Sequence, residues 1–392
     1  MNFRAAALPR RFCAIWLLIL LGALSAGAQD LPESFLTLLQ KQMNVSEANL
    51  ASLERGEAVT KLLKTRAKKE IAALGILRVN APGDLFIDRF RDITDFKKSA
   101  PVLQIGKFSN PPNLADLNGL TLDPCCLEAI RNCKIGDCDM KMSAEMMTRF
   151  HQELNPSAAY YNERANALAR LMLFDYLKAY LQTGNAALIE YRDGKNAVRV
   201  ADEFRSLLEQ SRFLADYAPE FYKYLEEFPK ASSPNIEDFI YWSKEKFGLN
   251  PVLSLTHVVI YKRVVGDSTE VLMASKQLYA NHYFDGSLGL GVFVEGSKGP
   301  ATSGSYMMYL NRSRADALQG WFLGIKRSIV GGRVREGLAR NLKLVKKRIE
   351  SYALRPSTTT RRDKTDPKKG KPVSHYYEES TTIQNWLDGA TL

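Results

Sequence analysis

The sequence predicts an α+β protein in which a curved antiparallel sheet packs against a long C-terminal helix and carries a large all-helical insertion. Residues 70–108 follow the order strand, turn, helix, strand, and residues 236–311 consist of strand-like segments separated by short turns. Residues 314–351 carry apolar side chains at three- and four-residue spacing, which is typical of one long amphipathic helix. Between the two strand regions, residues 110–228 have almost entirely helical periodicity.

The first 28 residues have the order of a cleavable secretory signal peptide. Three arginines precede an apolar run over residues 12–24, and Ala26-Gly27-Ala28 supplies a small-residue cleavage site. Because the apolar run is shorter than the ~20 residues of a spanning helix, a retained membrane anchor is the weaker alternative. No later stretch offers ~18 apolar residues, so we expect a soluble mature chain, secreted or periplasmic, that begins at Gln29.

Residues 29–69 are predicted to form an N-terminal helical segment. The apolar side chains of residues 33–55 recur with helical spacing, and Ser46 can cap a second short helix. The following residues, 70–80, alternate as a strand does. A turn follows, and Asp84 is placed to cap the next helix.

The predicted helical insertion spans residues 109–235. One of its helices has Asp123 at the cap and Pro124 at the first helical position. Residues 157–182 form its longest segment, and their apolar side chains spread over more than one face, which indicates a helix buried on several sides.

Four cysteines lie close together in this insertion: Cys125, Cys126, Cys133 and Cys138. In an oxidising compartment an even cluster predicts two disulfides. Adjacent cysteines rarely bridge each other, which leaves Cys125 with Cys138 and Cys126 with Cys133, or the crossed pairing. A four-thiolate zinc site is the alternative, but its usual C-x2-C knuckles are missing, so we expect neither a metal nor another cofactor. Without a C-x-x-C motif, thiol redox chemistry has little support.

Five antiparallel strands are expected after the insertion, joined by short connections. They cover residues 238–247, 252–263, 271–284, 288–295 and 305–311. Together with the terminal helix they complete a core domain of residues 70–108 and 236–352. The remaining residues, 353–392, are rich in Thr, Lys and Pro and are predicted to form a disordered basic tail.

The run from Ile76 to Phe86, ILRVNAPGDLF, resembles the first strand, Ala-Pro turn and first helix of the START and birch-pollen-allergen superfamily. The long terminal helix supports this resemblance to a helix-grip fold, which covers about residues 70–108 and 236–352. It implies a curved sheet that encloses an apolar cavity against the helix, for lipids, sterols, polyketides or other hydrophobic ligands. The superfamily has no universal catalytic residues, so none is carried over. The run CKIGDC at residues 133–138 also suggests a family of exported bacterial proteins.

The expected ligand-binding residues are aromatic and polar side chains of the strands, with two apolar side chains of the terminal helix. They are Tyr241, His257, Tyr279, Tyr309, Asn311, Trp321 and Ile325.

Hairpin pairing of the strands would also bring together four candidate catalytic residues, namely His257, His282, Glu245 and Lys276. A histidine beside a carboxylate is a general base, and a lysine can hold an anion. The alternative is that each of these residues satisfies a neighbour or faces water. No phosphate loop, nucleophile elbow, H-E-x-x-H or EF-hand pattern occurs, so the sequence leaves open whether the protein is an enzyme.

The formal net charge of +11 is concentrated at the C-terminal end of the chain. Residues 355–372 hold seven Lys or Arg against two Asp, and the terminal helix before them is also basic. For an exported protein the matching partner is an anionic envelope surface rather than nucleic acid. A merely solvated basic helix and tail is the alternative.

Three function classes follow from these observations. The first is an exported protein that binds a hydrophobic small molecule or lipid between the sheet and the C-terminal helix. The second is a periplasmic enzyme, a hydrolase or cyclase, that uses the His/Glu/Lys cluster. The third is an envelope-associated interaction protein.

Overall fold

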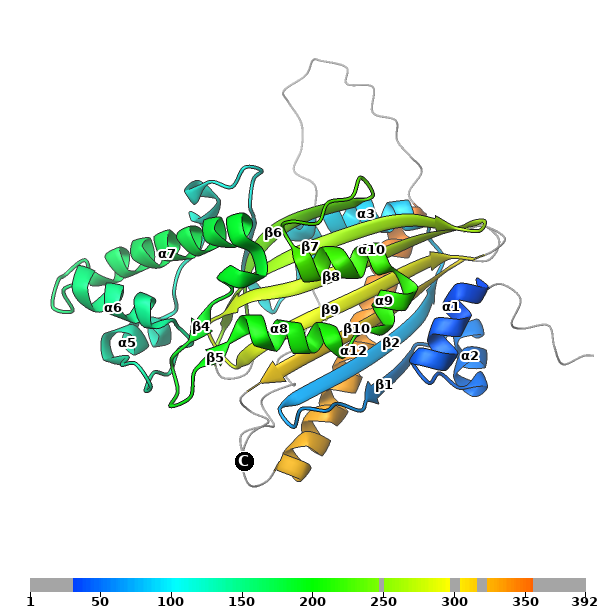
Figure 1. The fold of residues 1–392 in the computed structure, drawn as a ribbon, viewed down its shortest axis with the longest axis horizontal. Helices are drawn as coiled ribbons and strands as arrows, with labels where there is room; N and C mark the ends of the chain where they lie inside the picture. Colours follow the sequence, from blue (N-terminus) through cyan, green and yellow to red (C-terminus); the bar gives the residue numbers. More distant parts are fainter. Residues whose placement is uncertain (1–30, 247–249, 297–303, 316–322, 355–392) are drawn as a thin grey trace, which may run out of the picture.

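The computed structural model describes residues 31–246, 250–296, 304–315 and 323–354. Its centre is a curved antiparallel sheet of eight strands in the order β1-β2-β10-β9-β8-β7-β6-β3 (Figure 1). The strands are β1 (Val59–Leu63), β2 (Glu70–Val79), β3 (Val102–Lys107), β6 (Ile236–Glu245), β7 (Val252–Val265), β8 (Ser268–Ala280), β9 (Phe284–Glu295) and β10 (Ser305–Ala315). The predicted α+β class with a large antiparallel sheet and a C-terminal helix is confirmed.

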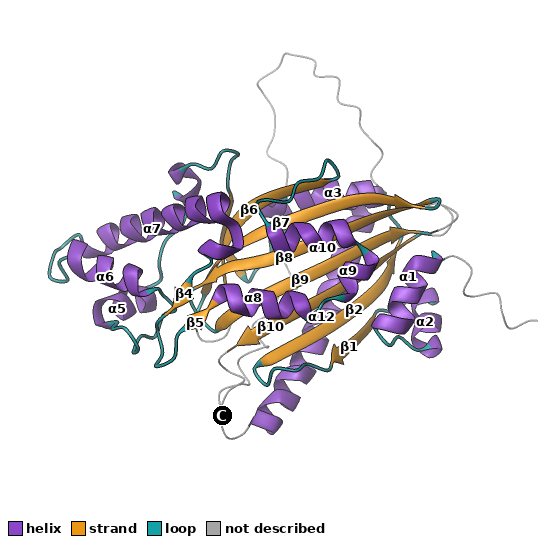
Figure 2. Ribbon diagram, in the orientation of Figure 1, coloured by secondary structure: helices purple, strands orange, loops and turns teal. Residues whose placement is uncertain are grey.

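Helices cover both faces of the sheet (Figure 2). On one face lie the helices of the segment between β3 and β6, of which α8 contacts β9 and β10. That segment contains η2 (Leu114–Leu117), α5 (Pro124–Asn132), α6 (Ala144–Glu153), α7 (Tyr161–Thr183), η3 (Gly184–Ala187), α8 (Val200–Glu209), α9 (Phe213–Tyr217) and α10 (Pro219–Glu227). It also contains a short hairpin, β4 (Glu190–Tyr191) with β5 (Val198–Arg199). The N-terminal helices α1 (Glu33–Thr37), η1 (Leu38–Gln42) and α2 (Glu47–Glu54) belong to the same apolar cluster.

The opposite face is covered by α3 (Gly83–Arg91), α4 (Ile93–Phe96) and the long α12 (Leu323–Ala353). The main sheet contacts of α12 are with β1 and β2, at one edge of the sheet, and α12 also contacts α3. Helix α12 comes closest to the strands at Gly75 of β2. A Cβ added there would lie 2.3 Å from Leu342 Cδ1 and 3.2 Å from Leu338 Cγ. We call the sheet face that α3, α4 and α12 cover the α12 face.

Alternation along the strands explains why two helical layers can pack on one sheet. In β9, Val292 and Val294 belong to the large apolar cluster under α7–α10, whereas Phe293 between them packs with α3. The same alternation occurs in β10, where Met308 and Met307 point to opposite faces. Both faces are therefore apolar over much of the sheet, unlike a sheet with one wet side.

A buried ionic network joins the helical layer to one end of the sheet. Glu70, fully buried, accepts from Arg312 Nη1 at 2.8 Å and from Arg314 Nη2 at 3.2 Å. Arg314 also reaches Glu203 of α8 at 2.6 Å. Removing Glu70 would take from the buried Arg312 the carboxylate with which it pairs, which is the costly case for such networks.

The N-terminal prediction was only partly right. Ser46 caps α2, with its Oγ accepting from Asn49 N at 3.3 Å, as expected. Residues 29–69 are not purely helical, however, because β1 forms an edge strand that pairs with β2. The predicted cap Asp84 lies inside the first turn of α3, and Pro82 occupies the cap position.

The other element boundaries agree with the prediction to within a few residues, with two exceptions. The segment predicted as an all-helical insertion contains the β4–β5 hairpin. Residues 314–315, predicted as the start of the terminal helix, still belong to β10, and the described helix begins at Leu323. Asp123 and Pro124 stand at the cap and first position of α5, as predicted. The expected signal peptide and basic tail lie outside the described residues. Within the described ranges, no helix is both long and apolar enough to cross a bilayer.

The contact between α12 and the sheet can be tested at Gly75. We expect Gly75→Val to lower the free energy of unfolding by ~1–3 kcal/mol, because the new side chain overlaps Leu342 and Leu338. The matched control is Gly332→Ala in α12, where an added Cβ meets nothing within 4 Å. That change should stabilise by ~0.5–1 kcal/mol, since alanine restricts the unfolded chain more than glycine does. Urea unfolding measures both, and equal effects would contradict this packing.

Candidate functional site

The α12 face of the sheet is divided into an apolar band and a polar band. The apolar band lies under α3 and the C-terminal half of α12. Its sheet residues are Leu77, Val79, Val258, Ile260, Val271, Met273, Phe293 and Met307. The polar band lies at the other end of β7–β10, where the same strand parity continues with side chains that are half-buried. Its residues are Ser254, Ser275, Gln277, Ser287, Tyr309, Asn311 and Ser313.

The centre of the polar band is a small hydrogen-bonded group. Ser313 Oγ donates to Asn311 Oδ1 at 2.7 Å, and the Ser287 and Ser313 hydroxyls are 2.8 Å apart. Asn311 Nδ2 makes only long contacts, 3.4 Å to Ser287 Oγ and 3.5 Å to Tyr309 Oη. Such distances lie at the weak end of the range for hydrogen bonds. The Asn311 amide therefore retains donor capacity for a further acceptor.

Tyr309 lies across the neighbouring strand at Gly289. A Cβ on Gly289 would be 2.8 Å from Tyr309 Oη and 3.4 Å from its ring, so glycine is what lets the phenol lie flat on β9. Burial raises the pKa of Tyr309 above its ordinary value. The phenol is thus a neutral hydrogen-bonding group at physiological pH.

A charged pair stands at the β6 side of this face. Lys97 Nζ lies 2.7 Å from Glu245 Oε1 and 3.4 Å from Tyr241 Oη, and Ser243 Oγ donates to Glu245 at 2.6 Å. Burial alone would raise the pKa of Glu245, but Lys97 and Ser243 together hold it below its ordinary value. Glu245 is consequently an ion-paired carboxylate.

The opposite face of the sheet carries two of the other candidates, His257 and Lys276. They are direct neighbours in the register of β7 and β8, and Tyr180 of α7 bridges them. Its hydroxyl lies 2.8 Å from His257 Nδ1, and Lys276 Nζ donates to it at 3.1 Å and also to Asn185 Oδ1. Asp238 Oδ2 lies 3.2 Å from His257 Nε2, an ion-pair distance without hydrogen-bond alignment.

This second group is enclosed. Tyr180, His257 and Lys276 are each at most 2% exposed. Burial lowers the pKa of His257, and the opposing effect of Asp238 does not restore it. Burial also lowers the pKa of Lys276 well below its ordinary value. Buried histidine and lysine side chains that form hydrogen bonds with the Tyr180 hydroxyl account for this group without a reaction.

The four catalytic candidates therefore do not converge as predicted. Glu245 has the strand parity of Tyr241 and lies on the α12 face, whereas His257 and Lys276 lie on the other face. His282 follows β8, and Asn281 before it pairs with Leu253, so His282 is about five residues, or ~16 Å, along the sheet from His257. Its Nε2 lies 3.5 Å from Cys126 Sγ.

The expected ligand-binding residues also divide. Tyr241, Tyr309 and Asn311 share the α12 face, but His257 and Tyr279 lie on the other face. Tyr279 donates to the Lys141 carbonyl at 3.0 Å and lines a small apolar cavity beside α6 and α7. Trp321 and the side chain of Ile325 lie outside the described residues.

The cysteine pairing differs from both expected connectivities. Cys133 and Cys138 form a disulfide with a Cα–Cα distance of 4.4 Å, and Cys125 and Cys126 are free thiols. The reason is local, because Lys134 and Asp137 pair as a β-bridge and bring the two ends of this short loop together. Burial raises the pKa of Cys126 to about 12, so its thiol is protonated and slow to oxidise.

The chain matches no model of a known protein family, no curated protein and no solved structure. Sequence reasoning missed Tyr180 and the Ser287–Ser313 pair. Tyr180 follows Leu173 and Leu177 on the buried side of α7, and this spacing was the available signal. The serine pair follows only from the register of β9 and β10.

The buried state of Lys276 predicts how stability depends on pH. An unfolded lysine keeps its proton up to pH ~10.4, so between the lowered folded pKa and that value the unfolded chain binds more protons. Stability should therefore rise with pH over that window, by at most ~1.4 kcal/mol per unit. Lys276→Met should remove this contribution. Parallel stability curves for the two proteins from pH 6 to 10, measured by urea unfolding, would contradict the lowered pKa of the buried Lys276.

The cysteine assignment predicts two free thiols in a chain that begins at Gln29. Thiol titration in guanidinium without reductant should find two per chain, whereas the pairing expected from sequence leaves none. Trypsin should release residues 132–134 and 135–141 as one disulfide-linked pair, because Lys134 lies between Cys133 and Cys138. Any linked peptide that contains Cys125 or Cys126 would argue against the assignment.

Proposed function

We propose that this protein binds an amphipathic small molecule or lipid on the α12 face of its sheet, between the strands and α12. One observation carries the proposal: a continuous apolar band and a half-buried polar band meet on the same face of the same four strands. Ligand sites in proteins combine apolar walls with a few placed polar groups. The apolar band suits a hydrocarbon part and the polar band suits a headgroup.

The polar band supports a neutral or anionic headgroup with acceptor oxygens. Asn311 offers an underused amide donor, and Tyr309 offers a neutral phenol. Met273 and Met307 at the border between the bands are flexible side chains that adapt to ligands of different shape. Tyr309 and Asn311 were expected at the site, and the serines that lie beside them change the proposed ligand from purely hydrophobic to amphipathic.

We further propose that the architecture is helix-grip-like, with residues 109–235 as an insertion. The curved sheet and the close contact of α12 at Gly75 support this, as does the resemblance of residues 76–86 to the START superfamily. A shared fold does not by itself transfer a function, so the ligand class rests on the two bands.

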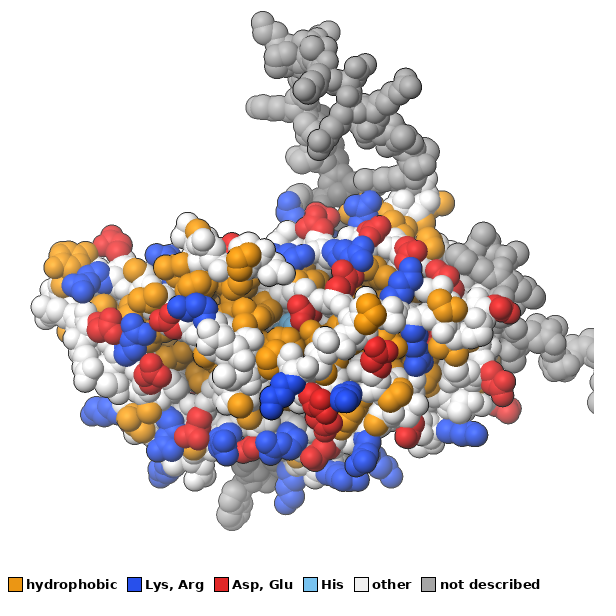
Figure 3. Space-filling view, turned by 45° about the horizontal axis from the view of Figure 1, so that its top comes forward, with side chains coloured by type: hydrophobic (Ala, Val, Ile, Leu, Met, Phe, Trp, Pro, Cys, Tyr) orange, Lys and Arg blue, Asp and Glu red, His pale blue; other side chains and the backbone are white. Residues whose placement is uncertain are grey.

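The other two function classes have less support from the geometry. A His/Glu/Lys active site needs Glu245 on the same side of the sheet as His257, and they lie on opposite sides. For envelope association, the face drawn in Figure 3 carries cations and anions interspersed, without a large field of one sign. The basic tail on which that class depends lies outside the described residues.

Ligand binding can be tested with a probe that has a headgroup and a matched probe that lacks it. Monopalmitoyl glycerol and methyl palmitate, titrated onto delipidated full-length mature protein, serve this purpose, with native mass spectrometry as the readout. We expect Asn311→Leu to weaken binding of the glyceride ~5–10-fold, as loss of one hydrogen bond implies, and to leave the ester within ~2-fold.

The control variant is Thr269→Leu. Thr269 is a half-buried polar residue of β8 with the strand parity of Met273, but it lies at the opposite end of the strand from the polar band. Binding of both probes should be unchanged. If neither probe binds the wild-type protein, or if both variants behave alike, the proposed site is wrong.

A further inference from the structure

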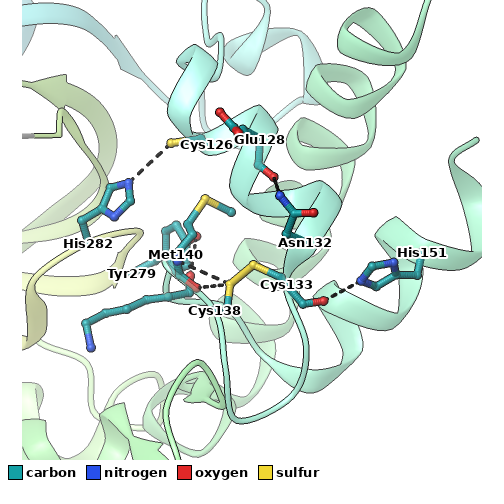
Figure 4. The surroundings of a disulfide bond; sticks show 10 residues. Cys126, Glu128, Asn132, Cys133, Cys138, Met140, His151, Tyr279 and His282 are labelled. Carbon is teal, nitrogen blue, oxygen red and sulfur yellow. Dashed lines mark hydrogen bonds between the residues drawn. A yellow bond between two sulfur atoms is a disulfide. The ribbon is translucent and has the colours of Figure 1, made fainter. Parts of the chain in front are cut away.

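Three metal-binding side chains converge at a place remote from the polar band. Cys125 and Cys126 lie in the first turn of α5, and His282 lies in the turn after β8. Their Sγ and ring nitrogen atoms are all within 4.8 Å of one another, and Cys126 Sγ lies 3.5 Å from His282 Nε2. Figure 4 shows the Cys126 and His282 side chains pointing toward each other.

These distances suit one metal ion at the centre. Metal–sulfur bonds of about 2.3 Å and metal–nitrogen bonds of about 2.0 Å place donor atoms roughly 3.3–4.0 Å apart in trigonal or tetrahedral sites. The three side chains need shifts of less than about 1 Å to reach that arrangement. Cys126 and His282 are buried and Cys125 is partly exposed, so the site opens to the outside only at Cys125.

A neighbouring amide supports a metal thiolate at Cys126. Asn281 Nδ2 donates to Cys126 Sγ at 3.3 Å, and its Oδ1 accepts from Leu253 N at 2.8 Å. The second bond fixes which end of the amide faces the sulfur. Donors that point at a ligand atom orient metal ligands and tune their charge, and this one is itself held by the sheet.

The surroundings favour a soft ion. A small cavity of about 20 Å³, the space open to the centre of a water molecule, lies next to Asn281. Its lining includes four methionines, Met140, Met142, Met146 and Met172. In the view of Figure 4 the Met140 side chain extends from the disulfide loop toward Cys126 and His282. Thiolate and thioether ligands select Cu(I), which also accepts two or three ligands, whereas zinc sites almost always have four.

We propose that Cys125, Cys126 and His282 form a Cu(I) site, with the methionine-lined cavity next to Asn281 as its thioether-rich surroundings. Binding displaces one proton from each thiol, forms two Cu–S bonds and one Cu–N bond, and changes no oxidation state. The Cys133–Cys138 disulfide holds the end of α5. Cys125 and Cys126 remain unbridged, so two thiols that can bind a metal lie near an oxidised cysteine pair. This proposal stands independently of the ligand on the α12 face.

The site can be tested by titrating Cu(I) anaerobically onto the full-length mature protein with its disulfide intact. Bathocuproine disulfonate serves as the competing chelator. We expect one tightly bound equivalent, with an X-ray absorption spectrum of two sulfurs and one nitrogen. Cys126→Ser and His282→Gln should each weaken binding by at least ~100-fold, more than the loss of an outer-shell partner costs.

The control variant is His151→Gln. His151 is also close to this region, with its Nε2 2.7 Å from the Cys133 carbonyl, but it does not belong to the three-residue group. Its Cu(I) affinity should equal that of the wild type. Circular dichroism and the disulfide-linked tryptic peptide check that each variant is folded.

Three outcomes would overturn the proposal. The first is wild-type protein that takes no Cu(I) from the competitor, and the second is a folded Cys126→Ser variant that binds Cu(I) as tightly as wild type. The third is preferential loading of Zn(II) from an equimolar mixture, which would exclude a site selective for a soft monovalent ion.

Discussion

The structure depends on one constraint, which is that an eight-stranded sheet with two largely apolar faces must bury both of them. A helical layer on each side meets this requirement, and each layer comes from a different part of the chain. The segment between β3 and β6 covers one face, whereas α3, α4 and the C-terminal α12 cover the other. Where the α12 face changes from apolar to polar side chains, the requirement is relaxed, and the proposed ligand site lies there.

Buried polar groups in this protein are of two kinds. Glu70, Arg312 and Arg314 form a charged group in which each ion has a partner across elements. Lys276 and His257 instead surround Tyr180, and burial, which disfavours the charged form, lowers the pKa of both. Arg314 of the charged group also pairs with Glu203 of α8 and so fixes how α8 sits on the sheet, since ions without partners are costly to bury. The group around Tyr180 is held by hydrogen bonds, so residues that look catalytic in the sequence can serve the core.

Periodicity predicted the sheet, the long helices and the caps at Ser46 and Asp123, because those features are local. The strand β1 escaped prediction because Val59–Leu63 is short and its stability comes from pairing with β2. Glu245 and His257 lie on different strands, so the face that each occupies depends on the β6–β7 register, in which Ile240 lies opposite His257. The cysteine pairing depended on a single β-bridge between Lys134 and Asp137, which spacing cannot reveal.

The register of β2 has a consequence for how the chain acquires its structure. Residues 70–79 of β2 pair with residues 305–314 of β10, so the partner of β2 is synthesised more than 200 residues after it. Within the meander β6–β10 each strand pairs with the next one in the sequence, so the meander can assemble as soon as it is complete. Until then β2 presents an open edge, the kind of surface that favours wrong pairings between chains. A chain translocated unfolded across a membrane would have to be shielded for the whole of that interval.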